Sequence, residues 1–285
     1  MILSGKPVAQ ALCRQTLAAS ELLRQQGTVP TLCVVRLGED PSDLAYERGI
    51  CKRADSVGVA VHKRLLPADC TREALLAAID QLNHDESVHG VLLFRPLPKH
   101  LRPCQAEIFN ALAPAKDVDG MTDGSAAGIF LGTGAGFAPC TPSACMQMLD
   151  HYQIDPCGKR TVVIGRSPVV GKPLAMLLLA RHATVTVCHT RTKDLPEEAK
   201  RAELLIACAG SAGLVGADCV GPETIVLDVG VNWQDGKYVG DVRFDEVEPV
   251  AAAITPVPGG VGAVTTATLL RHVVTAAMRQ NRREA

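Results

Sequence analysis

The stretch VVIGRSPVVGKPLAMLLLARHATVTVCHTRT, residues 162–192, decides the fold of this chain. The β-branched run 161–164 is typical of a buried strand, and Gly165 permits a tight turn after it. Gly171, Pro173 and the apolar residues that follow predict a helix, and residues 184–188 predict a second strand. A helix that begins at such a turn directs free N–H groups and its positive dipole end toward a pyrophosphate. The stretch therefore predicts a dinucleotide-binding unit.

The ends of these two strands favour NADP over NAD. The second strand runs into His189-Thr190-Arg191, where an NAD-binding unit more often has an acidic residue for the ribose hydroxyls. Arg166 and Arg191 can instead converge with Ser167 and Thr190 on one spot, and guanidinium and hydroxyl groups suit a 2′-phosphate. We expect NADP as the cofactor, the alternative being a solvated basic edge on an ordinary α/β unit.

Length and composition limit the classes of protein to which the chain can belong. A chain of 285 residues with 47% hydrophobic residues can build two domains, and its net charge of -1 favours neither a nucleic-acid groove nor a membrane surface. The 11 cysteines include no C-x-x-C pair, so we expect reduced thiols, a cytoplasmic protein and no metal. A zinc site at Cys140 and Cys145 is the alternative, but a second ligand pair is missing. Lys6 and Arg14 interrupt the N-terminal segment, which predicts neither a secretory signal nor a membrane span.

Helix and strand patterns alternate along the chain and predict an α/β fold. Helical spacing over 7–26, 41–57 and 71–83 alternates with strand patterns over 31–37, 59–66 and 90–94. Segment 116–136 has little periodicity and is expected to be a loop over a site. A helix through Tyr152, strands within 204–210 and 224–232, a hairpin around Asp235-Gly236 and a last helix complete the pattern.

Five ordered motifs resemble the methylenetetrahydrofolate dehydrogenase/cyclohydrolase (FolD) family across essentially the whole chain. They are Lys116-Asp117-Val118-Asp119-Gly120, Pro139-Cys140-Thr141-Pro142, Gly165-Arg166-Ser167 with Val170-Gly171-Lys172-Pro173, Asp228-Val229-Gly230-Val231-Asn232, and Thr255-Pro256-Val257-Pro258-Gly259-Gly260-Val261-Gly262. The resemblance implies a three-layer α/β catalytic domain over 1–142, completed by a helix at 266–285, and a Rossmann NAD(P)-binding domain over 143–265. It also implies a cleft between the domains for folate and NADP, and a homodimer.

The family's two reactions make different demands on the protein. The cofactor takes a hydride from 5,10-methylenetetrahydrofolate, which needs mainly correct positioning, and the resulting 5,10-methenyl cation is hydrolysed to 10-formyltetrahydrofolate, which needs activated water. For the second step, the family uses the lysine of a Y-x-x-x-K motif and the glutamine of a V-Q-L-P-L-P motif. In this chain Tyr46 is followed by Ile50 at the lysine position, and Leu93-Phe94-Arg95-Pro96-Leu97-Pro98 has Phe94 at the glutamine position.

No neighbouring cation is expected to replace the missing lysine. Lys52 lies about 200° around the helix from Ile50, at about 100° per residue. Arg53 lies nearer the Tyr46 face, but a guanidinium that does not deprotonate is a poor general base. A misalignment is discounted because Pro41, Tyr46 and Gly58 keep the family's spacing. Cyclohydrolase activity is therefore expected to be weak or absent.

The resemblance assigns roles to further residues. Tyr46 and Asp119 are the expected catalytic residues: Tyr46 can stack on a pterin, and the Asp119 carboxylate can accept paired hydrogen bonds from an aminopyrimidine edge. The alternative for Tyr46 is a helix residue that lies half in the core, and the alternative for Asp119 is a residue that caps its loop. The expected substrate-binding residues are Tyr46, Leu93, Phe94, Asp119, Pro258, Gly259, Gly260 and Val261. The expected cofactor-binding residues are Gly165, Arg166, Ser167, Val170, Gly171, His189, Thr190, Arg191, Gly210 and Val231.

Three functions remain open from the sequence. The leading hypothesis is an NADP-dependent methylenetetrahydrofolate dehydrogenase with little or no cyclohydrolase activity. Departures at Asp43, Met121 and Ala263-Val264 allow a second, a relative that acts on a different one-carbon folate or another small molecule. The third is a non-catalytic homologue that binds folate or nucleotide.

Overall fold

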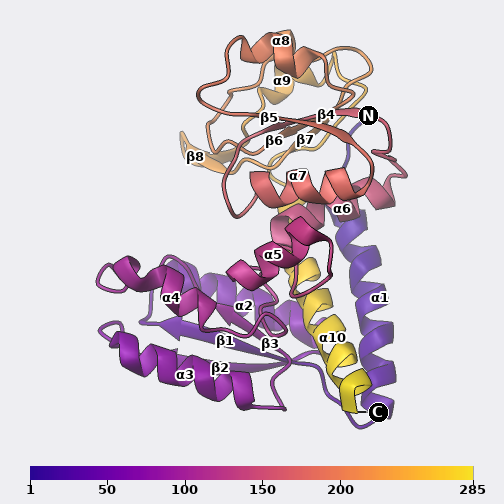
Figure 1. Cartoon of the computed structure of the whole chain (residues 1–285). Coiled ribbons are helices and arrows are strands. Elements are labelled where there is room, and N and C mark those ends of the chain that lie inside the picture. Colours follow the sequence, from indigo (N-terminus) through magenta and orange to yellow (C-terminus); the bar gives the residue numbers. More distant parts are fainter. Residues whose placement is uncertain (285) are drawn as a thin grey trace. The chain divides into compact units, whose positions relative to one another are not determined.

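The computed structural model describes residues 1–284 and divides the chain into two compact units (Figure 1). The five-stranded unit comprises Met1–Gln10 and Thr141–Thr265, and the three-stranded unit comprises Ala11–Cys140 and the described residues from Thr266 onward. Residues 1–10 pack with the five-stranded unit because Ile2 forms a parallel bridge with Ile254, which differs from the expected boundary. The two-domain α/β fold expected from the sequence is confirmed.

The three-stranded unit is a parallel sheet covered by helices. Strands β1 (Thr31–Leu37), β2 (Ala60–Leu66) and β3 (Gly90–Leu93) lie in the order β2-β1-β3. Helix α2 (Pro41–Ser56) connects β1 to β2, and α3 (Arg72–His84) connects β2 to β3. The unit also contains α4 (Gln105–Asn110), α5 (Asp123–Leu131), most of α1 (Gly5–Gln25) and nearly all of α10 (Thr265–Glu284).

Local side-chain chemistry fixes where the helices of this unit begin. The carboxylate of Asp40 accepts a hydrogen bond from the Ser42 N–H at 2.8 Å, and proline occupies the first turn of α2. The Thr71 hydroxyl accepts from the Ala74 N–H at 3.2 Å and caps α3 in the same way. These caps confirm the helix starts that the sequence predicted.

The segment 116–136 is not the continuous loop that its sequence predicted. Helix α5 occupies 123–131, and the Thr122 hydroxyl caps it by accepting from the Ser125 N–H at 3.0 Å. The helix is rich in glycine and alanine and has no apolar stripe, so periodicity gave no signal. The prediction was wrong because an N-terminal side-chain cap marks this helix, whereas an amphipathic pattern is missing.

The five-stranded unit is a parallel sheet with the order β10-β7-β6-β4-β5. Its strands are β4 (Arg160–Ile164), β5 (Thr184–Cys188), β6 (Leu204–Ala207), β7 (Ile225–Asp228) and β10 (Ala253–Ile254). Helix α7 (Gly171–Ala180) follows β4, and α6 (Cys140–His151), α8 (Leu195–Lys200) and α9 (Phe244–Val247) complete the unit's helices of four or more residues. The predicted hairpin is the antiparallel pair β8 (Asn232–Gln234) and β9 (Lys237–Val239).

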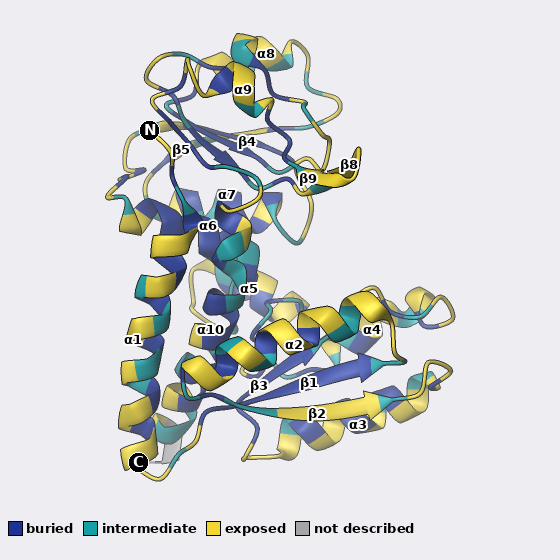
Figure 2. Ribbon diagram, turned by 180° about the vertical axis from the view of Figure 1, so that it is seen from behind, coloured by how far each residue is buried: buried dark blue, intermediate teal, exposed yellow. Residues whose placement is uncertain are grey.

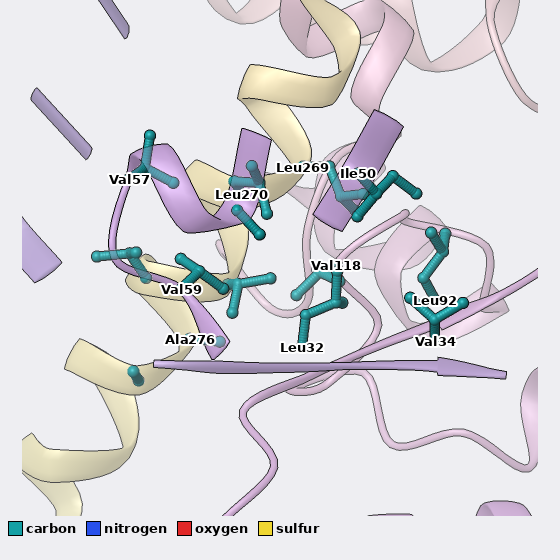
Figure 3. Packing of buried hydrophobic residues seen from close by; sticks show 14 of the residues in the cluster. Leu32, Val34, Ile50, Val57, Val59, Leu92, Val118, Leu269, Leu270 and Ala276 are labelled. Atoms are coloured by element: carbon teal, nitrogen blue, oxygen red, sulfur yellow. The ribbon is translucent and has the colours of Figure 1, made fainter. Parts of the chain in front are cut away.

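The core of the three-stranded unit places α2 and α10 against one face of the sheet. Ile50 from α2, Val57 directly after α2 and Leu270 from α10 pack with Leu32 and Val34 from β1 (Figure 3). Each fully buried side chain of this size stabilises the fold by about 1.5–3 kcal/mol. Figure 2 shows the resulting pattern, with β1 buried and the outer side of α2 exposed. This packing sets the position of the α2 residues that the sequence analysis singled out.

Candidate active site

The predicted cofactor residues gather at one edge of the five-stranded sheet. From β4 the chain goes to β5 on one side and then to β6 on the other, so the connections diverge between β4 and β6. In open parallel sheets, ligands bind at the carboxyl ends of the strands beside such a point. The loops after β4, β5, β6 and β7 carry, respectively, Gly165, His189, Gly210 and Val231.

The turn after β4 leaves no room for side chains at its glycines. Gly165 has φ +136°, and a Cβ there would lie 2.4 Å from the Cys208 carbonyl oxygen. A Cβ at Gly171 would lie 2.2 Å from the Gly165 carbonyl oxygen. The Ser167 hydroxyl accepts from the Val170 N–H at 3.0 Å and holds the turn closed before α7. The close backbone approach and the helix start fit a dinucleotide pyrophosphate.

The basic residues beside this turn are exposed and available to an anion. The side chains of Arg166 and Arg191 have no hydrogen-bond or ion-pair partner within residues 1–284. They follow adjacent strands, because Ile164 pairs with Cys188 in the β4–β5 ladder. The backbone N–H of Arg191 donates to His189 Nδ1 at 3.1 Å, which fixes the loop. Residues 189–193 contain no carboxylate, as the sequence predicted for an NADP site.

Asp241 organises the neighbouring loop, and sequence reasoning missed it. This fully buried carboxylate accepts from the N–H groups of Ala209, Gly210 and Ser211 at 2.6, 2.9 and 2.8 Å. Its partners lie about thirty residues away along the chain, so no local pattern marks it. Gly210 is thus held in place, and Val231, 60% exposed, lies after the next strand.

Four of the predicted substrate residues belong to the five-stranded unit. In the loop after β10, Pro258 and Gly259 are exposed, whereas Gly260 and Val261 are buried. The Gly259 carbonyl accepts from the Gly5 N–H at 2.8 Å, which ties the loop to its own unit. The role of these residues in binding substrate stays a prediction.

The other predicted substrate residues lie at the carboxyl edge of the three-stranded sheet. Phe94 directly follows β3, and its N–H donates to the Val35 carbonyl at 3.0 Å. A parallel bridge between Val91 and Asp117 places the segment that contains Asp117 alongside β3. Asp119 therefore reaches the same edge as Phe94.

The two positions expected from the resemblance to depart from the family pattern are apolar and buried. Ile50 is 0% exposed and Phe94 is 6% exposed, and both belong to the core cluster under α2. The Tyr46 ring lies over Phe94, with 5.5 Å between ring centroids. Lys52 is exposed, and Arg53 Nη1 contacts Cys13 Sγ at 3.9 Å, so neither stands in for the missing amine.

Asp119 is paired with a residue to which the sequence analysis gave no role. Arg95 Nη2 lies 3.0 Å from Asp119 Oδ2, and the two side chains are 33% and 20% exposed. Burial raises the pKa of Asp119, and the charge of Arg95 opposes that effect. Partial burial also raises the pKa of Tyr46 to about 12, and the charge of Asp119 adds to this shift. A charged residue just after a buried strand was the available signal for Arg95.

The first two residues of the Lys116–Gly120 motif are structural. Lys116 Nζ donates to the carbonyls of Leu82 and Asp85 at 2.7 and 2.6 Å. Asp117 accepts from the Ser125 hydroxyl at 2.7 Å and so supports the start of α5. The motif therefore uses two buried charges to present the third, Asp119, at the edge of the sheet.

The metal and membrane predictions can be compared with the described part of the chain. Within residues 1–284 no group of three or more histidine, cysteine or acidic side chains is arranged to hold a metal, and every described cysteine is a free thiol. Over the same residues, no helix combines the length and apolar character needed to cross a membrane.

Comparison with known proteins agrees with this geometry. Residues 139–281 match the model of the tetrahydrofolate dehydrogenase/cyclohydrolase NAD(P)-binding domain, and residues 3–119 match that of the family's catalytic domain. The chain is 47% identical over 277 residues to the bifunctional protein FolD of Carboxydothermus hydrogenoformans, covering 96% of each chain. It is similar to the crystal structure of the bifunctional FolD enzyme of Campylobacter jejuni, with a TM-score of 0.94, 40% identity and coverage of 98% and 99%.

A further relative was solved with ligands. The Trypanosoma brucei FolD structure, complexed with NADP and an inhibitor, has a TM-score of 0.90 and 33% identity, with 99% of this chain and 98% of that chain covered. The glycine turn and parallel sheet thus belong to an NAD(P)-binding domain joined to a second α/β domain. The chain belongs to the tetrahydrofolate dehydrogenase/cyclohydrolase family.

Proposed function

We propose that this protein is an NADP-dependent 5,10-methylenetetrahydrofolate dehydrogenase whose cyclohydrolase activity is weak or absent. The observation that carries the proposal is the contrast between the glycine turn at Gly165–Gly171 and the buried apolar pair Ile50 and Phe94. Membership of the family supports the folate substrate class.

The dehydrogenase step places modest demands on the protein. Bound NADP supplies the chemistry by accepting a hydride. Asp119 can accept hydrogen bonds from the pterin amino edge, and the half-exposed Tyr46 ring can pack on the pterin plane. The turn between β4 and α7 holds the pyrophosphate. These residues bind and orient, and none needs to move a proton for hydride transfer.

The hydrolytic step lacks a proton-transfer group in the expected place. Ile50 and Phe94 carry no titratable atom, and the Tyr46 hydroxyl, with its pKa raised to about 12, is a weak base at neutral pH. General acid–base catalysis typically contributes about 10²–10⁴ in rate. We therefore expect hydrolysis of the methenyl compound to be slower by at least that order than in a relative with the lysine.

The proposal extends to the choice of cofactor, the roles of the domains, the oligomeric state and the location of the protein. The exposed Arg166 and Arg191 favour NADP over NAD because guanidinium groups bind phosphate strongly. We also propose the domain roles 1–142 with 266–285 for folate and 143–265 for the cofactor, a homodimer, and a cytoplasmic location. Family membership supports these statements in general terms.

One observation favours a second candidate function. The pairing of Asp119 with Arg95 changes the polar edge offered to a substrate, so a relative that acts on another small molecule would also fit. A non-catalytic binding protein has no such feature in its favour.

Purified protein mixed with 5,10-methylenetetrahydrofolate and NADP tests the proposal. We expect formation of NADPH, with a lower KM for NADP than for NAD. Tight binding of NADP without its reduction would reject the dehydrogenase and support the second candidate. Failure to bind either dinucleotide would reject both.

A further inference from the structure

Arg95 is the least explained charged residue at the folate edge. It follows the buried Phe94 at the end of β3, and its guanidinium is one-third exposed. A guanidinium offers five N–H donors, and the contact with Asp119 at 3.0 Å uses one of its nitrogens. No other partner of the Arg95 side chain is found within residues 1–284, so further donors remain for a ligand.

Arg95 and Asp119 together form a mixed hydrogen-bonding edge. The ionised carboxylate only accepts hydrogen bonds, whereas the guanidinium only donates them. A 2-amino-4-oxo-pyrimidine ring presents the matching sequence along one edge: an amino donor, a ring N–H donor and a carbonyl acceptor. The carboxylate can take the two donors while the adjacent guanidinium reaches the carbonyl oxygen.

The ion pair opposes the effect of burial on the carboxylate. Asp119 is 20% exposed and lies near Tyr46 and the buried Cys140 thiol, and burial raises its pKa. The charge of Arg95 acts in the opposite direction and favours the ionised form. The Arg95 contact uses one oxygen, Oδ2, and a carboxylate has several lone pairs, so ligand donors can be accepted without breaking the ion pair.

We propose that Arg95 determines substrate specificity by donating a hydrogen bond to the 4-oxo group of a pterin whose amino edge is bound by Asp119. This inference rests on the proposed folate-binding function. A hydrogen bond to a charged group of this kind corresponds to a change of about 10- to 100-fold in affinity. Arg95 thus contacts the substrate and does not act only through Asp119.

The test compares two ligands across a small set of variants. One is tetrahydrofolate, with the 4-oxo group, and the other is its 2,4-diamino analogue, in which an amino donor replaces the carbonyl acceptor. Dissociation constants are measured by titration calorimetry for the wild type, Arg95→Leu and Arg95→Lys. We expect Arg95→Leu to reduce the preference for the 4-oxo ligand about 10- to 100-fold, and Arg95→Lys to reduce it less.

A matched control removes another arginine of the same unit. Arg72 pairs with the Glu107 carboxylate at 2.8 Å on the surface of α3 and α4, so Arg72→Leu removes an ion pair that lies on other elements. It is expected to leave the ligand preference unchanged. Thermal unfolding of each variant, and its affinity for NADP, establish that the protein is folded.

The possible outcomes separate this inference from the proposed function. Equal weakening of both ligands by Arg95→Leu would mean that Arg95 only supports Asp119, and tighter binding of both would mean that it blocks the site. Either result overturns the specificity role while leaving the folate function intact. A wild-type protein that binds NADP but neither pteridine ligand would overturn both.

Discussion

The two sheet edges of this protein offer different chemistry. At the five-stranded edge, the glycine turn, the Ser167 hydroxyl that closes it and the exposed arginines fit a dinucleotide. At the three-stranded edge, two buried apolar residues, Ile50 and Phe94, stand where the family resemblance implies a lysine and a glutamine. Replacing both members of a buried polar pair leaves no unsatisfied partner, whereas replacing one would. Under the proposed function, the protein would therefore lose one half of a bifunctional site without leaving a buried polar group unpaired in its core.

Introducing a lysine at position 50 and a glutamine at position 94 should have the largest effect on the contrast between the two edges. The double variant Ile50→Lys/Phe94→Gln places an amine and an amide in the same core cluster, near Tyr46. We expect the hydrolysis rate of methenyltetrahydrofolate to rise by about 10²–10⁴ because a proton-transfer group is regained. The decay of methenyltetrahydrofolate absorbance measures it.

The single variant Ile50→Lys is the control for this experiment. Because position 50 is fully buried, an amine there without the amide partner is expected to cost at least about 2 kcal/mol in the free energy of unfolding. The double variant should recover part of that loss. A folded double variant that hydrolyses no faster than the wild type would break the link between these positions and the missing activity.

Removing a basic residue from the cofactor edge should have a smaller effect. Arg191→Ala deletes one exposed guanidinium, and we expect the KM for NADP to rise about 10- to 100-fold while that for NAD changes little. Steady-state kinetics with both dinucleotides measures the change. Arg181→Ala, which removes a contact to Asp150 after the far end of α7, is the matched control. An equal loss with both dinucleotides would exclude a 2′-phosphate contact.

The smallest expected effect is on the free energy of unfolding, and it comes from a histidine of the three-stranded unit. Burial lowers the pKa of His272, and the charges of Arg271 and Arg279 act in the same direction. The hydrogen bond to the Val118 carbonyl and the charge of Asp117 oppose this, and the resulting pKa is about 4. An unfolded histidine titrates near 6.5, so below that pH the unfolded state binds more protons. The stabilisation is complete above pH 6.5 and is lost as the pH falls toward 4.

Chemical denaturation of the wild type at pH 6.5 and pH 5 measures this loss. We expect His272 to account for about 1–2 kcal/mol of the difference in unfolding free energy. The variant His272→Gln keeps a donor for the Val118 carbonyl but does not titrate, so its stability should depend less on pH. If the two proteins lose stability in parallel, the histidine is not the responsible group.

Sequence patterns predicted the features that depend on neighbouring residues. Strand β1 has the predicted bounds 31–37 because its β-branched run and the glycine after it are local signals. The departures at Ile50 and Phe94 were also visible within short motifs. Helix α5 was missed because its glycine- and alanine-rich sequence has no apolar stripe.

The features that escaped prediction join distant segments. Asp241 holds the backbone of Gly210 from 31 residues away, and Arg95 reaches Asp119 from 24 residues away. Neither pairing follows from spacing along a helix or strand. Only the packing of the parallel strands brings these residues to a common edge.

The most direct test of the central claim is the decay of 5,10-methenyltetrahydrofolate with the wild-type protein and no dinucleotide. The same preparation must first be shown to reduce NADP with 5,10-methylenetetrahydrofolate. The account predicts decay close to that of buffer alone, because the site holds isoleucine and phenylalanine in place of the proton-transfer pair. Rapid, enzyme-dependent decay at a rate comparable to NADP reduction would contradict it.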